Sequence, residues 1–310
     1  MNTYISVQKS QIYFYLETPL YIKNEKGDFV LYKAENTKID FNRFSEDAFP
    51  QLYIPEETKE TAFKELQSQL KEKLKKRINS GDLKSVKSVL REIVQEALQE
   101  PLEDNLQTLP ETLDIIYQEY SNTTNLLKDI AGLQFGGTTL AEHSVNVMLL
   151  VLNFCIFKKL PDEETKKLSL GALLHDIGLT RIPKQITEAN RKLSDSEFTT
   201  YKTHTILGHD IIKENKHINS LIAVGVLEHH ERLNGTGYPR KISNISFEGR
   251  LIGIIDCFDN LTNTEKLHRN KKDPFSAMKI IQDEILKEGH FDKYIFKDLC
   301  LSLLGKSKYS

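Results

Sequence analysis

The chain has 310 residues, of which 39% are hydrophobic and 28% charged, a balance typical of a globular protein and not of a disordered one. Lysine and arginine number 42 against 44 for aspartate and glutamate, which gives a formal net charge of -2. This charge provides no overall positive field, so we expect no nucleic-acid partner, and any anion binding must depend on local clusters.

The first 55 residues show the alternation and aromatic enrichment that are typical of strands. So small a module buries little surface, and we expect it to need another part of the chain for stability. We predict a small α+β module over residues 1–55, with strands at 12–16, 21–22, 29–32 and 51–54, a turn at 24–27 and a short helix at 40–49.

Residues 56–100 form a highly charged segment with apolar residues at helical spacing. A break at Ser80 and Gly81 divides it, so we predict a connector of two helices. The apolar stripes are Phe63, Leu66, Leu70 and Leu74, then Leu83, Val86, Leu90 and Val94. Two interpretations stay open: the stripes cover a neighbouring domain, which we favour because the repeat is short for a coiled coil, or they pair with a second subunit in a homodimer.

From Pro101 to Ser310 the helical pattern dominates, and we predict an all-α bundle. The longest apolar run, 145–157, is shorter than the ~20 residues of a membrane-spanning helix, which indicates a buried core helix and no membrane insertion.

Residues 1–10 do not have the pattern of a secretory signal. The scattered Cys155, Cys257 and Cys300 suit free thiols in a reducing compartment, so we expect a cytoplasmic protein.

Histidine and aspartate gather in short segments of this helical region. Phosphodiester hydrolysis needs a stabilised phosphorus centre, a hydroxide nucleophile and a neutralised leaving oxygen, and two divalent metals held by imidazoles and a bridging carboxylate can supply all three. A mixed nitrogen and oxygen set favours a transition metal. Each residue alone also suits a core, capping or solvated role, but their grouping favours a site. The candidates are His143, His175, Asp176, His204, His229, His230 and Asp256, while His209, His217, His268 and His290 are taken as structural.

Four segments together resemble the HD-GYP family. They are Leu173-Leu-His-Asp-Ile-Gly178 followed by Ile182-Pro183, Lys202-Thr-His-Thr-Ile-Leu-Gly208, His229-His-Glu-Arg-Leu-Asn-Gly-Thr-Gly-Tyr-Pro239, and Asp256-Cys-Phe-Asp-Asn-Leu-Thr262. They cover about 120 residues in the family's order. The resemblance implies an HD-type helical bundle and metal-dependent hydrolysis of cyclic di-GMP to pGpG or GMP by a bridging hydroxide.

The resemblance also implies roles for single residues. His143, His175, Asp176 and Asp256 match the ligands of one metal, with Asp176 as the bridge, and His204 and His229 match those of the second. His230 is either a further ligand or a phosphate contact. The position of a third-metal glutamate is Thr139, so we expect two ions, iron or manganese. Substrate contacts are assigned to Arg232, Gly235, Gly237, Tyr238 and Pro239; the glycines allow positive φ and close backbone approach.

The chain departs from the family at two cationic positions. Leu179 stands where the family usually has lysine, and Thr264-Glu265-Lys266 stands where it has an arginine that holds the ligand. Protonation of the leaving group then falls to water, Lys184 or Arg181, and Lys266 and Arg269 are further cations of this region. The alternatives are a metal-bound, weakly active cyclic-dinucleotide sensor with a signalling-protein partner, or hydrolysis of another phosphate ester.

Overall fold

The computed structural model describes residues 3–7, 9–37, 50–99, 105–123, 126–133, 139–263 and 270–305. The helix expected at 40–49 lies outside these ranges, as does the segment 264–269 with Glu265, Lys266, His268 and Arg269. The chain forms two compact units, Met1–Asn79 and Ser80–Ser310. The three-part division at residues 55 and 100 stays a prediction.

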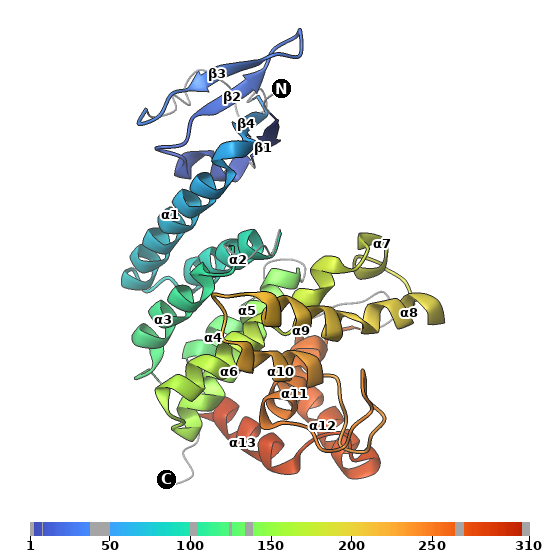
Figure 1. The fold of residues 1–310 in the computed structure, drawn as a ribbon. Coiled ribbons are helices and arrows are strands. Elements are labelled where there is room, and N and C mark those ends of the chain that lie inside the picture. The colour runs from blue at the N-terminus through green and yellow to red at the C-terminus, as the bar shows by residue number, and fades with distance from the viewer. Residues whose placement is uncertain are drawn as a thin grey trace. The chain divides into compact units, whose positions relative to one another are not determined.

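The first unit contains a four-stranded antiparallel sheet in the order β1-β4-β2-β3 (Figure 1). Its strands are β1 (Tyr4–Ser6), β2 (Leu20–Lys23), β3 (Phe29–Lys33) and β4 (Leu52–Pro55). In register, Tyr4 lies opposite Pro55, Tyr21 opposite Tyr53 and Ile22 opposite Val30. The turn expected at 24–27 joins β2 to β3, and the Asn24 side chain accepts hydrogen bonds from the amides of Lys26 and Asp28.

The prediction of a strand at residues 12–16 is wrong. Residues Lys9–Phe14 form a 3-10 helix, η1, in which Ile12 is buried. The carboxylate of Glu65, in the following helix, accepts hydrogen bonds from the amides of Leu16, Glu17 and Thr18. These backbone donors are therefore satisfied by a side chain instead of a neighbouring strand, so tertiary contacts override the strand propensity.

Both connector helices are confirmed. A short 3-10 helix, η4 (Glu56–Thr58), leads into α1 (Lys59–Asn79), and α2 (Leu83–Gln99) follows the break at Gly81. Of the expected apolar residues of α2, Val86, Leu90 and Val94 are buried and Leu83 is half-buried, and the helix packs on α5 within the second unit. In α1, Leu66, Leu70 and Leu74 are buried and Phe63 is half-buried.

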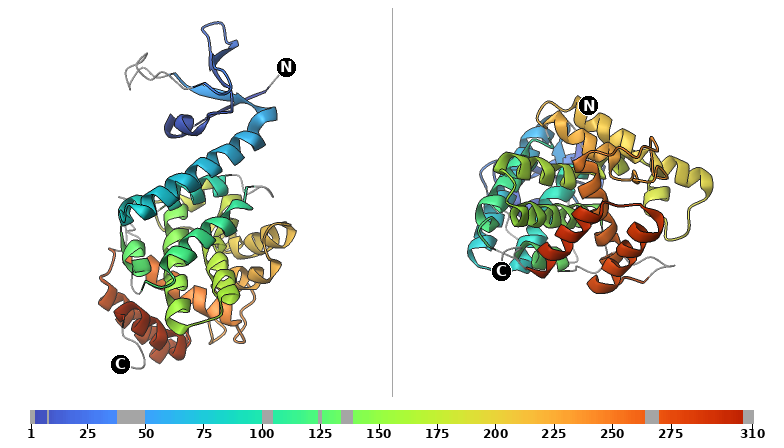
Figure 2. Two further views of the ribbon diagram at one scale, coloured as in Figure 1. Left: turned by 90° about the vertical axis from the view of Figure 1, so that its left-hand side faces the viewer. Right: turned by 90° about the horizontal axis from the view of Figure 1, so that it is seen from below.

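The second unit is helical, and its described residues contain no strand, as expected for a mainly α chain (Figures 1 and 2). Its long helices surround α5, which packs against α2, α4, α6, α11 and α13. The bounds are α3 (Thr108–Tyr120), α4 (Leu126–Gly132), α5 (Leu140–Lys158), α6 (Asp162–Leu174), η5 (Ile177–Arg181), α7 (Lys184–Thr187), α8 (Asp195–Lys202), α9 (His204–Glu214), η6 (Ser220–Ile222), α10 (Ala223–Glu228), α11 (Phe247–Thr262), α12 (Pro274–Asp283), η7 (Glu284–Glu288) and α13 (Lys293–Leu304).

Helix α5 forms the core of this unit. Every residue from Ala141 to Cys155 is buried, because the helix is apolar on nearly all sides and has neighbours on each of them. Among the described helices it alone is long and apolar enough to cross a membrane, yet 83% of its most apolar window is buried inside the protein. Its features are those of a core helix, as its sequence predicts.

Candidate metal centre

One cluster of ligand-type side chains joins three helices of the second unit. His143 lies in the first turn of α5, His175 directly follows α6, and Asp256 lies in α11; all three are buried. Nε2 of His143 is 3.1 Å from Oδ1 of Asp256 and 3.2 Å from Nε2 of His175. Nε2 of His175 is 3.8 Å from the same carboxylate oxygen. Three donor atoms therefore converge closely enough to share one ion.

A second cluster combines Asp176 with three histidines. His204 begins α9, and His229 and His230 follow α10. Nε2 of His204 is 3.2 Å from Oδ1 of Asp176 and 3.4 Å from Nε2 of His229, which lies 3.5 Å from the same oxygen. The half-buried His230 completes this group, with its ring 4.6 Å from that of Tyr238.

In four of the histidines, the ring nitrogen that faces away from the clusters, Nδ1, makes a hydrogen bond. Nδ1 of His175, His204 and His229 lies 2.7 Å from the carbonyl oxygens of Ala172, Tyr201 and Val226, and Nδ1 of His143 lies 2.7 Å from Oδ2 of Asp259. Because these oxygens only accept, Nδ1 carries the proton in each ring. Each Nε2 lone pair is thus directed at the clusters, which is the arrangement of metal-binding histidines.

Asp176 lies between the two clusters. Its Oδ2 is 3.4 Å from Nε2 of His175 and 3.6 Å from Nε2 of His143, while its Oδ1 faces His204 and His229. Oδ1 is buried and accepts no hydrogen bond from the residues that the structure describes. Burial of a carboxylate oxygen without a partner is costly, and a cation on each side of the carboxylate would remove that cost. The donor set therefore fits metal ions, with Oδ2 of Asp176 directed at the first cluster and Oδ1 at the second.

The cluster also shifts the pKa values of its members. Burial alone would raise the pKa of Asp176, but contacts with the neighbouring histidines outweigh burial and hold it well below the usual range. Burial alone would lower the pKa of His175, but Asp176 and Asp256 raise it to about 9. Burial and the neighbouring His229 lower the pKa of His230 well below its usual value. A bound cation displaces protons from such imidazoles.

The sequence analysis missed the groups that orient these ligands. Besides Asp259 on His143, Nδ2 of Asn260 donates to Oδ1 of Asp256 and Nδ2 of Asn263 donates to Oδ1 of Asp259, each at 2.6 Å. A signal was present, because α11 repeats an Asp-x-x-x-Asn spacing that places each amide one turn beyond its carboxylate. Polar pairs of this kind are common on exposed helix faces, so the spacing acquires meaning only once Asp259 is known to be fully buried.

The Gly-Tyr-Pro loop beside the second cluster is held by two buried glutamates. Carboxylate oxygens of Glu231 accept from the amides of Arg240 at 2.6 Å and Ile242 at 3.0 Å, and Glu228 binds the amide of Ser246 and the Arg240 guanidinium. The loop is therefore anchored on the two glutamates that flank the histidine pair.

The predicted loop glycines have the expected backbone roles. Gly235 has a φ of 76°, and a Cβ on Gly237 would lie 2.4 Å from the amide nitrogen of Arg232. The loop thus packs directly on the backbone that follows the histidine pair, with Tyr238 facing His230 and a cis peptide bond between Tyr238 and Pro239.

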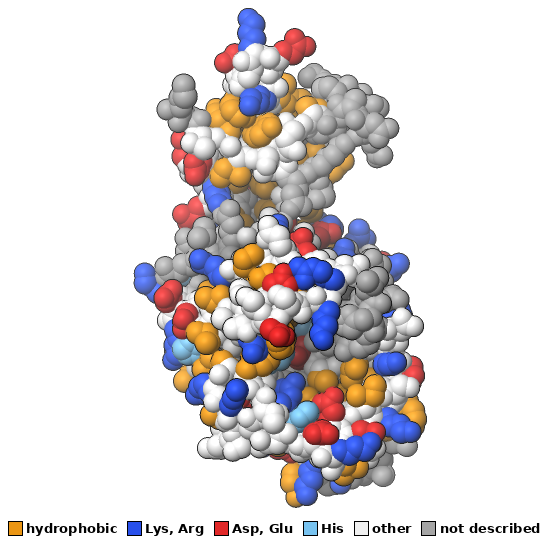
Figure 3. All heavy atoms as spheres, turned by 90° about the vertical axis from the view of Figure 1, so that its right-hand side faces the viewer, with side chains coloured by type: hydrophobic (Ala, Val, Ile, Leu, Met, Phe, Trp, Pro, Cys, Tyr) orange, Lys and Arg blue, Asp and Glu red, His pale blue; other side chains and the backbone are white. Residues whose placement is uncertain are grey.

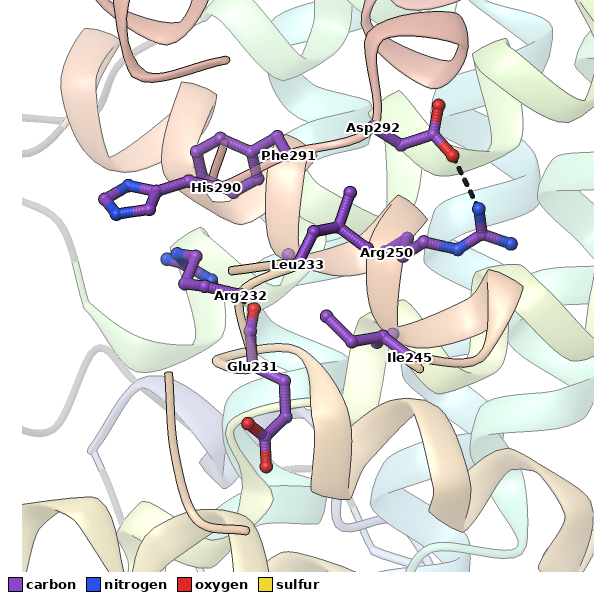
Figure 4. Close-up of a pocket in the computed structure, with 10 residues that line it drawn as sticks. Glu231, Arg232, Leu233, Ile245, Arg250, His290, Phe291 and Asp292 are labelled. Carbon is purple, nitrogen blue, oxygen red and sulfur yellow. Dashed lines mark hydrogen bonds and ion pairs between the residues drawn. The ribbon is translucent and has the colours of Figure 1, made fainter. Parts of the chain in front are cut away.

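The predicted contact residue Arg232 lies beside Phe291 in a small pocket (Figure 4). Its guanidinium stacks over the ring of Phe291 at 4.5 Å and donates to the carbonyl oxygens of His229 and Glu231. With Arg250, which binds Asp292 at 2.5 Å, it lines a small pocket. These contacts indicate that Arg232 positions the loop.

The structure describes two of the other predicted cations, Arg181 and Lys184. Arg181 and Lys184 are exposed, and neither side chain makes a hydrogen bond or ion pair with a residue that the structure describes. Leu179 is half-buried in η5. His209, His217 and His290 lie outside both clusters, where His209 contacts Asp210 and His290 contacts Glu284.

Comparison with known proteins adds three kinds of match. The model of the HD domain family matches residues 110–295. Cyclic di-GMP phosphodiesterase PA4108 of Pseudomonas aeruginosa is 30% identical over 175 residues, which are 56% of this chain and 41% of that protein. The 3'3'-cGAMP-specific phosphodiesterase 1 of Vibrio cholerae is 30% identical over 157 residues, 50% of this chain and 36% of that protein. The aligned regions thus span about two fifths of these relatives or less.

A solved structure shares the fold. Bd1817, a HDG"Y"P protein from Bdellovibrio bacteriovorus, superimposes with a TM-score of 0.64 over 96% of this chain and 98% of that one, at 16% sequence identity. At that identity the likeness concerns the fold.

Proposed function

The chain belongs to the HD domain family and resembles its HD-GYP members, and on that premise we propose that it is a metal-dependent phosphodiesterase that hydrolyses cyclic di-GMP to pGpG or GMP. The observation that supports this proposal most directly is the position of Asp176, whose two carboxylate oxygens face two separate clusters of histidine nitrogens. This geometry supports two metal ions, and the mixed nitrogen and oxygen donors suit iron or manganese. When bound, such ions supply Lewis-acid charge and make water a nucleophile at neutral pH.

The chain's own residues would prepare the site for this chemistry. Four histidines have their Nδ1 protons held by carbonyl or carboxylate oxygens, so their rings are oriented before substrate arrives. His230 is a further ligand or a contact to the phosphate, and its lowered pKa suits a neutral imidazole in either role. The glutamate-anchored loop would place Tyr238 against the substrate beside that ring.

Protonation of the leaving oxygen is where this chain differs from its family. Leu179 offers no proton, and Arg181 and Lys184 are exposed candidates that the substrate must reach. If water alone serves, we expect turnover slower by about 10²–10⁴-fold than with a positioned acid. Leu179 is thus the observation that favours the second function, a metal-bound cyclic-dinucleotide sensor of low activity.

Cytoplasmic location, a homodimer and a signalling-protein partner remain predictions.

The test is hydrolysis and binding of cyclic di-GMP and of 3'3'-cGAMP by protein loaded with iron or manganese under reducing conditions. We expect conversion to linear products by the wild type and by Asp210→Ala, which removes an exposed carboxylate of α9. We expect none from Asp176→Ala. Binding without turnover in every metal would refute the enzyme and leave the sensor, whereas hydrolysis by Asp176→Ala would refute the site.

A further inference from the structure

Helix α8 carries an exposed aromatic side chain toward the candidate metal centre. Phe198 is 46% exposed, and its ring lies 6.4 Å from that of Tyr201 and 6.4 Å from that of Tyr238. Those two rings in turn contact histidines of the second cluster, with Tyr201 5.1 Å from His204 and Tyr238 4.6 Å from His230. A continuous series of rings therefore leads from the ligand-type histidines to an exposed phenylalanine.

The orientation of the Phe198 ring suits a stacking surface. Its plane makes an angle of 12° with that of Tyr201 and is nearly perpendicular to Tyr238, at 81°. The ammonium of Lys202 lies 5.2 Å from the ring centroid of Phe198 and adds positive charge at the same place. The face of the molecule that carries α7 and α8 shows hydrophobic side chains among lysine and arginine side chains (Figure 3).

Helix α8 is also held more firmly than an ordinary exposed helix of eight residues. Ser194 and Glu197 form a reciprocal capping box, and the Glu197 carboxylate binds the guanidinium of Arg191 at 2.6 and 2.8 Å. A helix fixed at its start presents Phe198 in a defined position, which lowers the entropy cost of binding.

Single exposed phenylalanines are common and usually have no function. Phe275, which is 80% exposed on α12, is such a case, because it makes no aromatic contact with a described residue. Phe198 differs because its ring belongs to the series that reaches the histidines. This contrast supplies a matched control.

We propose that Phe198 is a substrate-contacting residue on which one nucleobase of the substrate stacks. The proposal rests on the proposed function, because it requires a nucleotide phosphodiester at the metal centre. Aromatic side chains bind bases by stacking, and every base offers a flat face to them. In a site where Leu179 replaces an expected cation, base stacking would supply binding that the phosphate contacts do not.

The chain has no tryptophan, so Phe198→Trp would introduce a single fluorophore at this position. We expect cyclic di-GMP and GMP to quench its emission in a saturable manner, because guanine stacks on the indole. We expect no saturable quenching for Phe275→Trp. We also expect Phe198→Leu to raise the KM for cyclic di-GMP about 10-fold with kcat unchanged, since stacking contributes to binding and not to the reaction itself. Phe198→Trp should restore the wild-type KM.

The outcomes separate this inference from the function. Hydrolysis by the wild type with an unchanged KM for Phe198→Leu and no quenching of Phe198→Trp would overturn the stacking role alone. Quenching without hydrolysis would overturn the phosphodiesterase and retain the stacking role. Absence of binding by cyclic di-GMP, 3'3'-cGAMP and GMP would overturn both.

Discussion

At the scale of single residues, the site depends on hydrogen bonds that orient the ligand-type side chains. His143 is the most elaborate case, because its Nδ1 contacts Asp259, which itself accepts a hydrogen bond from Asn263. Burial alone would lower the pKa of His143, but Asp256 and Asp259 outweigh it and raise the pKa well above its usual value. Asp259 therefore orients the ring, and it shares with Asp256 the effect on the charge of the ring.

We expect Asp259→Asn to lower metal affinity or activity about 10- to 100-fold, because an amide cannot supply the negative charge that strengthens His143 as a donor. Metal content after dialysis and the rate of cyclic di-GMP hydrolysis measure the effect. Asp283→Asn, at an exposed aspartate paired with Lys287, is the control. Equal metal content in the two variants would show that Asp259 does not orient the site.

The ligand-type residues could be predicted from the sequence because histidine and aspartate gather in a few short segments, although each of them alone also suits a structural role. The orienting residues could not, since Asp259, Asn260 and Asn263 resemble ordinary helix residues until their burial is known. The stacking of the Arg232 guanidinium on Phe291, which is 59 positions away, could not be predicted either, and a contact of Arg232 with substrate stays a prediction. Such long-range contacts have no local signature.

At the scale of elements, a close approach between η5 and α9 brings His175 and Asp176 near His204. A Cβ on Gly178 would lie 1.9 Å from the backbone oxygen of His204 and 2.6 Å from the amide nitrogen of Gly208. Only glycine allows the two backbones to approach this closely. The glycine after the His-Asp pair thus has a positioning role.

We expect Gly178→Ala to displace α9 and with it His204, so that metal content falls and activity drops by about 10²-fold or more. Gly132→Ala in α4 is the matched control, because a Cβ there meets no atom within 4 Å. Metal analysis and circular dichroism of both variants separate a local displacement from unfolding. Full metal content in Gly178→Ala would contradict the packing account.

A buried ion pair links α2 to the helix that carries His143. Lys87 is fully buried, and its ammonium donates to the carbonyl oxygens of Ala131 and Leu133 and lies 3.9 Å from Glu142. Burial lowers the pKa of Lys87 to about 8 even though Glu142 opposes the shift. Folding therefore releases a proton between pH 8 and the usual lysine pKa, and this group makes stability rise with pH in that range.

We expect Lys87→Met to lower the free energy of unfolding at pH 7 by about 1–3 kcal/mol, because two buried carbonyl oxygens lose their donor while Glu142 keeps Arg91 at 3.6 Å. The variant should also lack the Lys87 contribution to the rise in stability above pH 8. Urea unfolding from pH 7 to 10 measures both effects, with Lys84→Met, an exposed lysine of the same helix, as control. If the stability of Lys87→Met and that of the wild type depended on pH in the same way, the lowered pKa of Lys87 would be refuted.

Helices could be predicted more reliably than strands in this chain. Apolar periodicity identified α1 and α2, because each buries the face that its spacing implies, and the long apolar run identified α5, which is buried on all sides. Residues 12–16 have strand-like composition but form η1, since the chain satisfies its backbone donors through Glu65. The three-residue strand β1 is too short to leave a pattern.

At the scale of the whole molecule, the candidate ligands come from segments that are far apart in the chain. Residues from α5, the end of α6, α9, the segment after α10 and α11 meet at one place. A metal that binds only the folded arrangement must therefore stabilise the helical unit, by about 2.7 kcal/mol at a free concentration of 100 times its Kd. We expect manganese to raise the melting temperature and a chelator to lower it.

Differential scanning fluorimetry of the full chain measures this shift, and Asp176→Ala supplies the control because it lacks the bridging carboxylate. The variant should melt at the same temperature with and without manganese. A manganese-dependent shift of equal size in the variant would place the ion elsewhere.

The central claim is that Asp176 bridges two metal ions which together support hydrolysis of a cyclic dinucleotide. Its most direct test is a titration of chelator-treated protein with Mn²⁺ under reducing conditions, with linear product from cyclic di-GMP measured at each step. The account predicts hydrolysis that rises to a plateau at two equivalents of metal per chain. A plateau at one or three equivalents, or no product at any metal concentration, would contradict it.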